Sequence, residues 1–467
     1  MTIIKKSLLA ALASLCVASS LNAEVSKDSA HAKKSLEIYR EIISIPTVAG
    51  RGNVPKMANY LASELKEAGF SQGDIQVVPH GETAALIVRY RGDGSAKKRP
   101  ILLIAHMDVV EALPQDWERP PFKLTQDDTF FYGRGTEDNK LGVTMLTSTF
   151  IKLKESGFVP NRDLILAFSG DEETSMSTTR MLASNKALLE AEYVLNSDAG
   201  GGQLGKDGKA LSYAVQAAEK TYASFQLTVR NPGGHSSRPK PDNAIFDLAA
   251  ALNNLQAYRF PVRSADMTRA YFRATGMQLG GELGAAMIQF ADDPKNKQAS
   301  DRLAVESSYV GTTRTTCVPT LLSGGHAENA LPQSASVTVN CRIFPGVSVA
   351  EVKATLEKVV DNAAIEFVVL DQPIESPISA LRDDVMAAVT KAVQKRHPSV
   401  AVFGFMSSGA TDGMHFRSAG LPTWAASSVF MDPDDNFAHG LNERLPIKTF
   451  YEGLEHWEII LKELAGK

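Results

Sequence analysis

Polar side chains follow three short apolar runs of this sequence. Residues 101–105, 164–168 and 193–195 are runs of aliphatic and aromatic residues that are suited to buried strands. In open α/β sheets, ligands bind beyond the carboxyl ends of the strands. We therefore expect one converging site, formed by the residues that follow these runs: His106 and Asp108, then Asp171, Glu172 and Glu173, then Asp198.

The residue types at this site favour a metal. Imidazole and carboxylate groups bind zinc well, and carboxylates that bridge two ions suit a metal pair. Asp138 adds an acid in the glycine-bearing segment 131–140, and His439 adds a second imidazole. In the pair Glu172-Glu173, one carboxylate could bind metal while the other accepts a proton from the attacking water.

Each of these residues also has an ordinary structural interpretation. An aspartate after a strand is commonly a turn or helix cap, and a lone pair of glutamates commonly begins a solvated helix. The joint pattern favours the metal site. The sequence contains no His-Glu-x-x-His helix, no Gly-x-Ser-x-Gly elbow and no Gly-x-x-x-x-Gly-Lys phosphate loop. Four other histidines lie in polar contexts, and we predict that they are surface residues: His31, His80, His397 and His456.

Helical and strand-like segments alternate along the chain, which predicts an α/β fold. Residues 53–68 carry apolar residues at helical spacing and end at Gly69, and residues 142–156 are a second helical stretch. Such alternation is typical of a mostly parallel sheet that is covered by helices on both faces. We therefore expect a catalytic domain of this kind.

The pattern changes near Glu219 to that of a smaller α+β unit. Strands are predicted at 222–229, 333–343 and 365–370, with helices at 243–258 and 349–363 between them. After this unit the larger pattern returns, with a helix at 381–395 and a strand at 421–425, while residues 260–310 read as a helical elaboration of the insert. The predicted division is a signal peptide at 1–23, a catalytic domain at 24–219 and 374–467, and an inserted lid domain at 220–373.

The first residues are predicted to direct export. Lys5 and Lys6 precede an apolar or small-residue run that ends near a cleavage site at Ala23. This run is shorter than the roughly 20 residues that span a bilayer, so we expect no membrane span after cleavage. We predict a periplasmic or secreted protein. The alternatives are a buried N-terminal helix and a lipoprotein signal at Cys16, which the preceding Leu15 disfavours.

The overall composition excludes several classes of protein. The chain has 467 residues, of which 44% are hydrophobic and 22% charged, as in globular proteins and unlike disordered or fibrous chains. The formal charge of −4 does not favour a nucleic acid partner. Three cysteines are too few for a disulfide-dense scaffold or a cysteine-rich zinc finger. Cys317 and Cys341 could pair in an exported chain, but the sequence leaves this open.

Taken in order, the motifs resemble those of the M20 family of metallopeptidases. The matching motifs are His106-Met107-Asp108, Gly133-Arg134-Gly135 with Asp138 and Lys140, Asp171-Glu172-Glu173, Ser197-Asp198, Gly233-Gly234-His235-Ser236-Ser237 and His439. Residues 103–142, with Trp117 and Pro120-Pro121-Phe122, are most similar to the carboxypeptidase S and N-acyl-amino-acid hydrolase branch. The motifs Thr315-Thr316, Gly324-Gly325 and Asn329-Ala330-Leu331-Pro332 also resemble that branch.

The resemblance implies a site for two zinc ions. His106, Asp138 and Asp198 would hold one ion, and His439, Asp138 and Glu173 the other, so that Asp138 bridges the pair. Mixed nitrogen and oxygen ligands also suit cobalt or manganese. The peptide bond after the bridging aspartate is cis in the family, so the resemblance predicts a cis bond between Asp138 and Asn139.

The resemblance also assigns roles to residues around the metals. Asp108 would accept the free ring N–H of His106, and Glu172 would be the general base. The lid residue His235 would polarise the developing oxyanion, often across a dimer interface, so a homodimer through the lid is expected. Substrate-binding roles fall on three residues: Arg342 and Asn329 for a terminal carboxylate, and Gly409 in the loop 408–412. Without the resemblance, His235 and Asn329 read as turn residues and Arg342 as a strand-surface residue.

Two departures from the family pattern affect the pocket. The family has a glycine shortly after the glutamate pair, where this chain has Ser175-Met176, and it often has an acid after the third ligand, where this chain has Ala199. Neither change removes a ligand or the base. The prediction is an exported two-zinc hydrolase that cleaves an amide bond beside a free carboxylate, in a short peptide or an N-acyl amino acid. The alternatives are a deacylase of a small metabolite without a carboxylate clamp, and a zinc-binding protein without activity.

Overall fold

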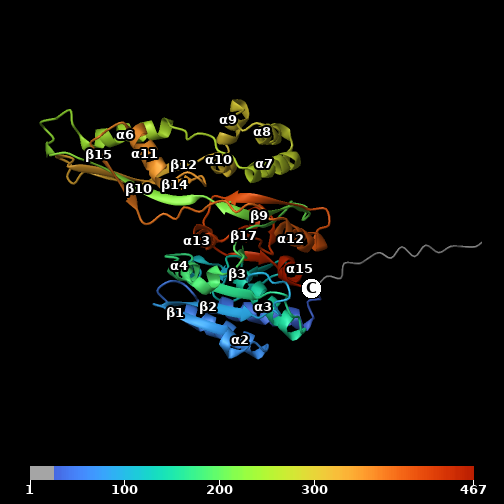
Figure 1. Cartoon of the computed structure of the whole chain (residues 1–467). Coiled ribbons are helices and arrows are strands. Elements are labelled where there is room, and N and C mark those ends of the chain that lie inside the picture. Colours follow the sequence, from blue (N-terminus) through green and yellow to red (C-terminus); the bar gives the residue numbers. More distant parts are fainter. Residues whose placement is uncertain (1–25, 467) are drawn as a thin grey trace, which may run out of the picture.

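Four parallel strands form the centre of a ten-stranded mixed sheet in the computed structural model, which describes residues 26–466 (Figure 1). Ile101 pairs with Leu164 on one side and with Tyr193 on the other. The three apolar runs are therefore neighbours in the sheet, and the sheet is parallel here, as predicted. The strands in spatial order are β1 (Ile75–His80), β2 (Thr83–Tyr90), β6 (Leu164–Ser169), β3 (Ile101–His106), β7 (Tyr193–Asn196), β17 (Thr423–Ala425), β9 (Ala210–Glu219), β8 (Gly201–Leu204) and β18 (Phe430–Met431), with β16 (Ala401–Ser407) also paired to β9.

Alternate residues of the central strands enter two separate apolar cores. Leu103 of β3 packs in one core and Ile104 in the other, so both faces of the sheet are covered by helices. The first core contains residues of α1 (Ala30–Ser44), α2 (Val54–Glu67), α3 (Lys140–Glu155), α12 (Asp383–Arg396), α14 (Ile447–Gly453) and α15 (His456–Ala465). The second contains residues of α4 (Ser177–Ser184), α5 (Lys186–Leu189) and α13 (Gly413–Ser418). The predicted α/β fold class is thus confirmed.

One of the four histidines predicted to lie at the surface, His456, is instead buried. It lies on the face of the large sheet that the first core covers. Its side chain lies beneath Arg396, whose Nη2 lies 3.1 Å from the ring Nδ1. Since a guanidinium only donates, Nδ1 accepts, and the proton on Nε2 is donated to the carbonyl of Ala426 at 3.1 Å. The polar sequence around His456 hides this because the partners come from other segments.

A second sheet is separate from the first and antiparallel, as the predicted insert requires. Ala223, Phe225, Leu227 and Val229 alternate along one strand of this sheet and are all buried. In Figure 1 this sheet lies apart from the large sheet. Its strands, in order, are β12 (Thr316–Gly324), β14 (Ser334–Ile343), β10 (Thr221–Arg230) and β15 (Ile365–Leu370); the accompanying helices are α6 (Ala244–Ala257) and α11 (Val349–Val360).

Two smaller sheets complete the topology. One pairs β11 (Gly234–His235) with β13 (Ala330–Leu331). The other joins β4 (Thr125–Gln126), β5 (Phe130–Tyr132) and β19 (Arg444–Pro446). The second of these brings the segment before Asp138 beside the segment after His439, which matters for the site described below.

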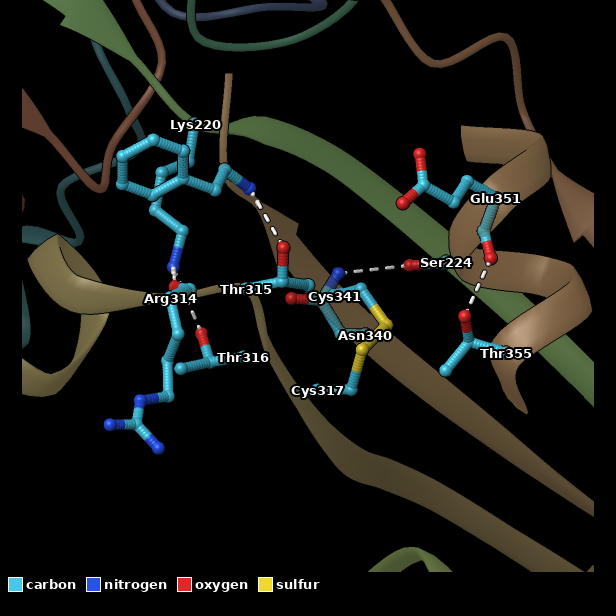
Figure 2. Close-up of a disulfide and its surroundings, with 11 residues drawn as sticks. Lys220, Ser224, Arg314, Thr315, Thr316, Cys317, Asn340, Cys341, Glu351 and Thr355 are labelled. Carbon is cyan, nitrogen blue, oxygen red and sulfur yellow. Dashed lines mark hydrogen bonds between the residues drawn. A yellow bond between two sulfur atoms is a disulfide. The ribbon is translucent and has the colours of Figure 1, made fainter. Parts of the chain in front are cut away.

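Cys317 and Cys341 form a disulfide in the smaller sheet. They are directly opposed residues of β12 and β14, with Cα atoms 4.1 Å apart (Figure 2). Beside them, Nζ of Lys220 donates to the carbonyl of Arg314 at 2.9 Å and to Oγ1 of Thr316 at 3.2 Å. The pairing that the sequence left open is therefore present in the structure.

The predicted elaboration at 260–310 is helical, but it packs in a different place from the one expected. It contains α7 (Asp266–Leu279), α8 (Gly281–Asp292), α9 (Lys297–Ala304) and α10 (Ser307–Thr313), with a small apolar core of its own around Phe272, Met287 and Phe290. The ring of Tyr271 lies 5.8 Å from that of Phe403 in β16. In Figure 1 these helices lie above β9, so they cover this part of the large sheet.

The signal peptide predicted at 1–23 lies outside the described residues. Within residues 26–466, none of the helices combines the length and the hydropathy that crossing a bilayer requires.

Candidate active site

Asp138 lies between two histidines that stand before and after the insert in the sequence. Its Oδ1 is 2.9 Å from Nε2 of His106, and its Oδ2 is 3.1 Å from Nε2 of His439. His106 is also 3.4 Å from Oδ1 of Asp198, and His439 is 2.9 Å from Oε1 of Glu173. The structure thus brings all five predicted ligands together.

The sheet explains this convergence. His106 is the last residue of β3, and the residues after β6 and β7 supply Glu173 and Asp198 at the same edge. Because these strands are parallel neighbours, their carboxyl ends meet there. His439 arrives from the segment before β19, which pairs with β5.

Buried Glu443 holds the loop that carries Asp138. Its Oε1 accepts the backbone N–H of Glu137 at 2.7 Å and that of Asp138 at 3.2 Å, and its Oε2 accepts Nη1 of Arg134 at 2.7 Å. The Asp138–Asn139 peptide bond is cis, as the resemblance predicts. Sequence reasoning missed Glu443, and the signal that could have found it is the arginine of Gly133-Arg134-Gly135, which needs an acid when buried.

Asp108 is placed at the site but differs in detail from its predicted contact. Its Oδ1 and Oδ2 accept the backbone N–H groups of Glu172 and Glu173, each at 3.0 Å. Nδ1 of His106 lies 3.1 Å from the backbone carbonyl of Asp108 and 3.6 Å from its carboxylate. The carboxylate is occupied by the two amides, so it orients the glutamate pair while the backbone carbonyl faces the imidazole.

Glu172 lies inside the same cluster. Its carboxylate, Nε2 or Nδ1 of His106 and a carboxylate oxygen of Glu173 all lie within 4.8 Å of one another. The side chain is buried. Burial, followed by the charges of Asp198 and Asp412, raises the pKa of Glu172 well above its usual value, while the charge of His106 acts against this shift.

The protonation preferences of the neighbouring groups show crowded negative charge. Burial raises the pKa of Asp198 to about 6. Hydrogen bonds to Asp138 and Glu173 raise the pKa of His439 to about 10. Burial lowers the pKa of His106, but the charge of Asp198 and hydrogen bonds to Asp138 and Asp198 outweigh it and raise this pKa well above its usual value.

This donor set fits a pair of divalent cations. Two groups of three donors, His106–Asp138–Asp198 and Asp138–Glu173–His439, each have their ligand atoms within 4.8 Å, and they share Asp138. Each of the two histidine rings faces a carboxylate. A bound cation could replace the ring proton that lies between the two groups. Imidazole nitrogens with carboxylate oxygens are the ligands that zinc and related ions prefer.

Two of the predicted substrate-binding residues lie together. Nη1 of Arg342, on β14, donates to the carbonyl of Ser408 at 3.2 Å, and Ser408 precedes Gly409. The guanidinium also lies over the ring of Tyr222, with its carbon 4.7 Å from the centroid. A half-buried arginine therefore borders the predicted substrate loop.

His235 and Asn329 lie elsewhere. Both belong to the β11–β13 region, where the backbone N–H of Ser236 donates to the carbonyl of Asn329 at 3.0 Å, and both are exposed. Among the described residues, neither makes a contact with the five predicted ligands. One chain alone does not bring them to the metal site.

The first departure from the family pattern has a backbone consequence. Met176 adopts a left-handed conformation with φ of +49°, which favours glycine. The turn is kept because the preceding carboxylate of Asp171 accepts the backbone N–H groups of Ser177 at 2.7 Å and Thr178 at 2.9 Å. Asp171 therefore caps α4, and only its two neighbours reach the site.

The comparisons with known proteins agree with this geometry. A family model described as "Peptidase family M20/M25/M40" matches residues 102–463. The human protein named N-fatty-acyl-amino acid synthase/hydrolase PM20D1 is 26% identical over 450 residues, covering 93% of this chain and 88% of the relative. Probable carboxypeptidase S-like 2 of Dictyostelium discoideum is 26% identical, covering 81% of this chain and 74% of the relative. The family model confirms the predicted family, and these two relatives carry names of the predicted branch.

A solved structure shares the fold. The M20 family metallo-carboxypeptidase Sso-CP2 from Sulfolobus solfataricus aligns with a TM-score of 0.69 at 19% identity, covering 92% of this chain and 98% of that structure's chain. The large sheet with its inserted antiparallel sheet is therefore a known architecture.

Proposed function

The chain belongs to peptidase family M20/M25/M40, and from that premise we propose that it is an exported hydrolase that uses two zinc ions to cleave an amide bond beside a free carboxylate. The substrate is a short peptide or an N-acyl amino acid. The observation that carries the proposal is Asp138, whose two oxygens face different histidines at 2.9 and 3.1 Å. This is the arrangement that a carboxylate bridging two cations needs.

The ligands of the two ions follow from the two donor groups. His106, Asp138 and Asp198 would hold one ion, and His439, Asp138 and Glu173 the other. The pair, when bound, supplies Lewis acidity that activates the attacking water and polarises the scissile carbonyl. Cobalt or manganese would suit the same ligands.

Glu172 is proposed as the general base. It lies within the cluster but belongs to neither of the two groups that share Asp138. A buried carboxylate with a raised pKa is suited to accept a proton from water and to return it to the leaving amine. Asp108 positions this base through the backbone N–H of Glu172.

The carboxylate of the substrate is proposed to bind at Arg342. A guanidinium recognises a carboxylate with two parallel hydrogen bonds, and Arg342 lies beside the loop of Gly409. Asn329 and the oxyanion residue His235 act in this proposal from the exposed lid, so they reach the site through a partner subunit or a closing movement.

The first experiment tests the metals and the base together. Protein purified with zinc is assayed on N-acyl amino acids and dipeptides, and its bound metal is counted. Glu172→Gln should lower kcat by about 10²- to 10⁴-fold while two zinc ions per chain remain bound. The control is Glu155→Gln, at an exposed position at the end of α3, which should match the wild type. A Glu172→Gln enzyme with wild-type rate would contradict the mechanism, and a wild type without hydrolysis would favour a zinc-binding protein.

A homodimer through the smaller sheet is also proposed. β12 is an edge strand of that sheet, and the side chains of Leu321 and Leu322 are each 69% exposed. Phe246 at the start of α6 is 69% exposed as well. Edge strands with exposed apolar side chains favour pairing with another chain. Sedimentation should give a dimer, and Leu321→Glu with Leu322→Glu a monomer; an active wild-type monomer would overturn this proposal.

Export is proposed from the N-terminal sequence, with support from the disulfide. Lys5, Lys6 and the apolar run up to residue 21 have the form of a signal peptide, and disulfides persist in oxidising compartments. We also propose that the exported chain is divided into a catalytic domain at 24–219 and 374–467 and an inserted lid at 220–373. N-terminal sequencing of the exported protein should begin at Glu24. An uncleaved protein that stays inside the cell would contradict the export.

A further inference from the structure

A cavity of about 620 Å³ lies where the helical elaboration joins the smaller sheet. The chain passes from α6 to α7 through residues 258–265 and returns from α10 to β12 through residues 314–315. The backbone N–H of Arg263 donates to the carbonyl of Thr313 at 2.8 Å, so the two connections run side by side. Residues of both connections line the cavity, so a molecule bound there would contact both.

The side chains around this cavity carry an excess of positive charge. Five of the described residues that line it are cationic: Arg259, Arg269, Lys295, Lys297 and Arg314. Two are acidic, Asp293 and Asp301. Asp301 already pairs with Lys297, and Asp293 accepts the backbone N–H of Lys295 at 2.9 Å. The two acids therefore cannot balance the cations that surround the cavity.

Arg314 is the most buried of these cations. It is 6% exposed, and arginines buried to this degree are almost always paired with an acid. Its Nη2 donates to Oγ of Ser300 at 2.7 Å, and its Nε donates to Oγ1 of Thr313 at 3.3 Å. Within residues 26–466 it forms no ion pair with a carboxylate. Figure 2 shows its guanidinium turned away from Lys220, so the nearby disulfide region supplies no counter-charge either.

Two further arginines border the same space. Nε of Arg269 donates to the carbonyl of Ala291 at 2.8 Å, which holds this guanidinium at the cavity, and its Nη1 lies 4.0 Å from the exposed Asp266. Burial and the charge of Arg259 lower the pKa of Arg314, while the charge of Asp301 acts against this shift. The arginines therefore repel one another, and an anion bound among them would relieve this repulsion.

We propose that this cavity is a binding site for a phosphate group, which Arg269, Lys295 and Arg314 hold. A phosphate monoester carries a charge of about −1.5 to −2 at pH 7, and guanidinium groups bind phosphate oxygens through paired hydrogen bonds. The cavity is larger than a phosphate group alone would fill, and Phe260 and Pro294 give it apolar walls that suit the organic part of a small phosphomonoester. The site is separate from the proposed metal centre and does not depend on the proposed hydrolysis.

Calorimetric titration of the zinc-loaded protein with inorganic phosphate and with phenyl phosphate tests this inference. Sodium chloride keeps the ionic strength constant, so that screening is the same throughout. The wild type should bind both anions, and Arg269→Gln should weaken binding at least about tenfold because charged hydrogen bonds are lost. Lys295→Gln should weaken it at least about threefold, and this exposed position does not affect folding. Arg273→Gln is the matched control on α7 and should bind as the wild type does, because Arg273 pairs with Asp292 and does not line the cavity.

Chelation separates this site from the proposed metal centre, because bound zinc would also attract phosphate. Binding at the cavity should survive metal removal with its sensitivity to Arg269→Gln unchanged. Tighter binding of phenyl phosphate would identify a phosphomonoester as the ligand, and equal affinities would identify the phosphate group alone. The inference is overturned if neither anion binds, if binding disappears on chelation, or if folded Arg269→Gln and Lys295→Gln bind as the wild type does.

Discussion

At the scale of single residues, the site depends on groups that orient other groups. Glu443 accepts three backbone N–H groups of the loop that holds Asp138, and Asp108 accepts those of Glu172 and Glu173. Each buried carboxylate accepts hydrogen bonds from backbone N–H groups, and these bonds hold the backbone of the loop in place. The reacting groups are therefore positioned by backbone contacts as well as by their own side chains.

Arg342 should control the affinity for carboxylate substrates. Arg342→Met removes a guanidinium whose hydrogen bonds to a charged group contribute about 1.5–3 kcal/mol, so KM should rise about 10- to 100-fold with little change in kcat. The measurement is steady-state kinetics on an N-acyl amino acid and on its carboxamide. The carboxamide should show no difference between the two enzymes. An unchanged KM for the acid would support the deacylase without a carboxylate clamp.

His456 should make the folded protein less stable in acid. Burial lowers the pKa of His456 well below 6.5, so the unfolded chain binds a proton that the folded chain does not. Stability is therefore complete above pH 6.5 and falls as the pH decreases below it, by up to about 1.4 kcal/mol for each pH unit. His456→Gln keeps a donor and an acceptor but does not titrate.

The expected result is a smaller loss of melting temperature between pH 7 and pH 5 in His456→Gln than in the wild type. Other histidines add to the acid sensitivity of both proteins, since burial lowers the pKa of His31 and of His415 to about 4. The difference between the two slopes isolates His456. Equal slopes would show that its burial does not govern the acid response.

At the scale of elements, the strands of the central sheet could be predicted and the edges could not. Residues 101–105, 164–168 and 193–195 are continuous apolar runs because both faces of β3, β6 and β7 are buried. β12 has exposed side chains through most of its length, so it has no apolar alternation to detect. The docking of α7 on β16 depends on contacts such as Tyr271 with Phe403, which no local pattern contains.

The site residues show the same difference: some can be predicted from local sequence, and others depend on contacts with remote segments. His106, Glu173 and Asp198 follow buried strands, so topology alone brings them together. Glu443 and His456 act through partners in remote segments, and their neighbours in sequence say nothing about them. Arg342 and Asn329 owe their predicted roles to resemblance, and the structure places only Arg342 beside the substrate loop.

The disulfide should stabilise the smaller sheet. It closes a loop with a sequence separation of 24 residues, for which chain-entropy arguments give about 3 kcal/mol. Cys317→Ser with Cys341→Ser should shift the denaturant midpoint of that sheet downward. Mild reduction of the wild type should produce the same shift, while the proposed metal site, whose candidate ligands include no cysteine, should keep its bound metal. Identical midpoints with and without the bond would refute a stabilising role.

At the scale of the whole molecule, the metals should join segments that are far apart in the chain. The five proposed ligands come from both halves of the large domain, which the insert separates. A ligand that binds only the folded state stabilises it by about 2.7–4.1 kcal/mol at 100 to 1,000 times its dissociation constant. Metal removal should therefore lower the melting temperature of the large domain.

Calorimetry with and without a chelator measures this effect. Glu172→Gln should keep the metal-dependent rise in melting temperature, because the base is not one of the proposed ligands. Asp138→Asn should lose most of the rise, because both donor groups need that carboxylate. A rise that survives in Asp138→Asn would show that the ions bind elsewhere.

The contact between His439 and Glu173 also sets when the protein becomes competent during its biosynthesis. These residues are 266 positions apart, so His439 is synthesised well after Glu173. Until that segment has left the ribosome and paired β19 with β5, the nascent chain holds at most one of the two proposed donor groups. Synthesis and folding of the segment that carries His439 thus complete the proposed metal site, and chains truncated before this residue should accumulate no activity.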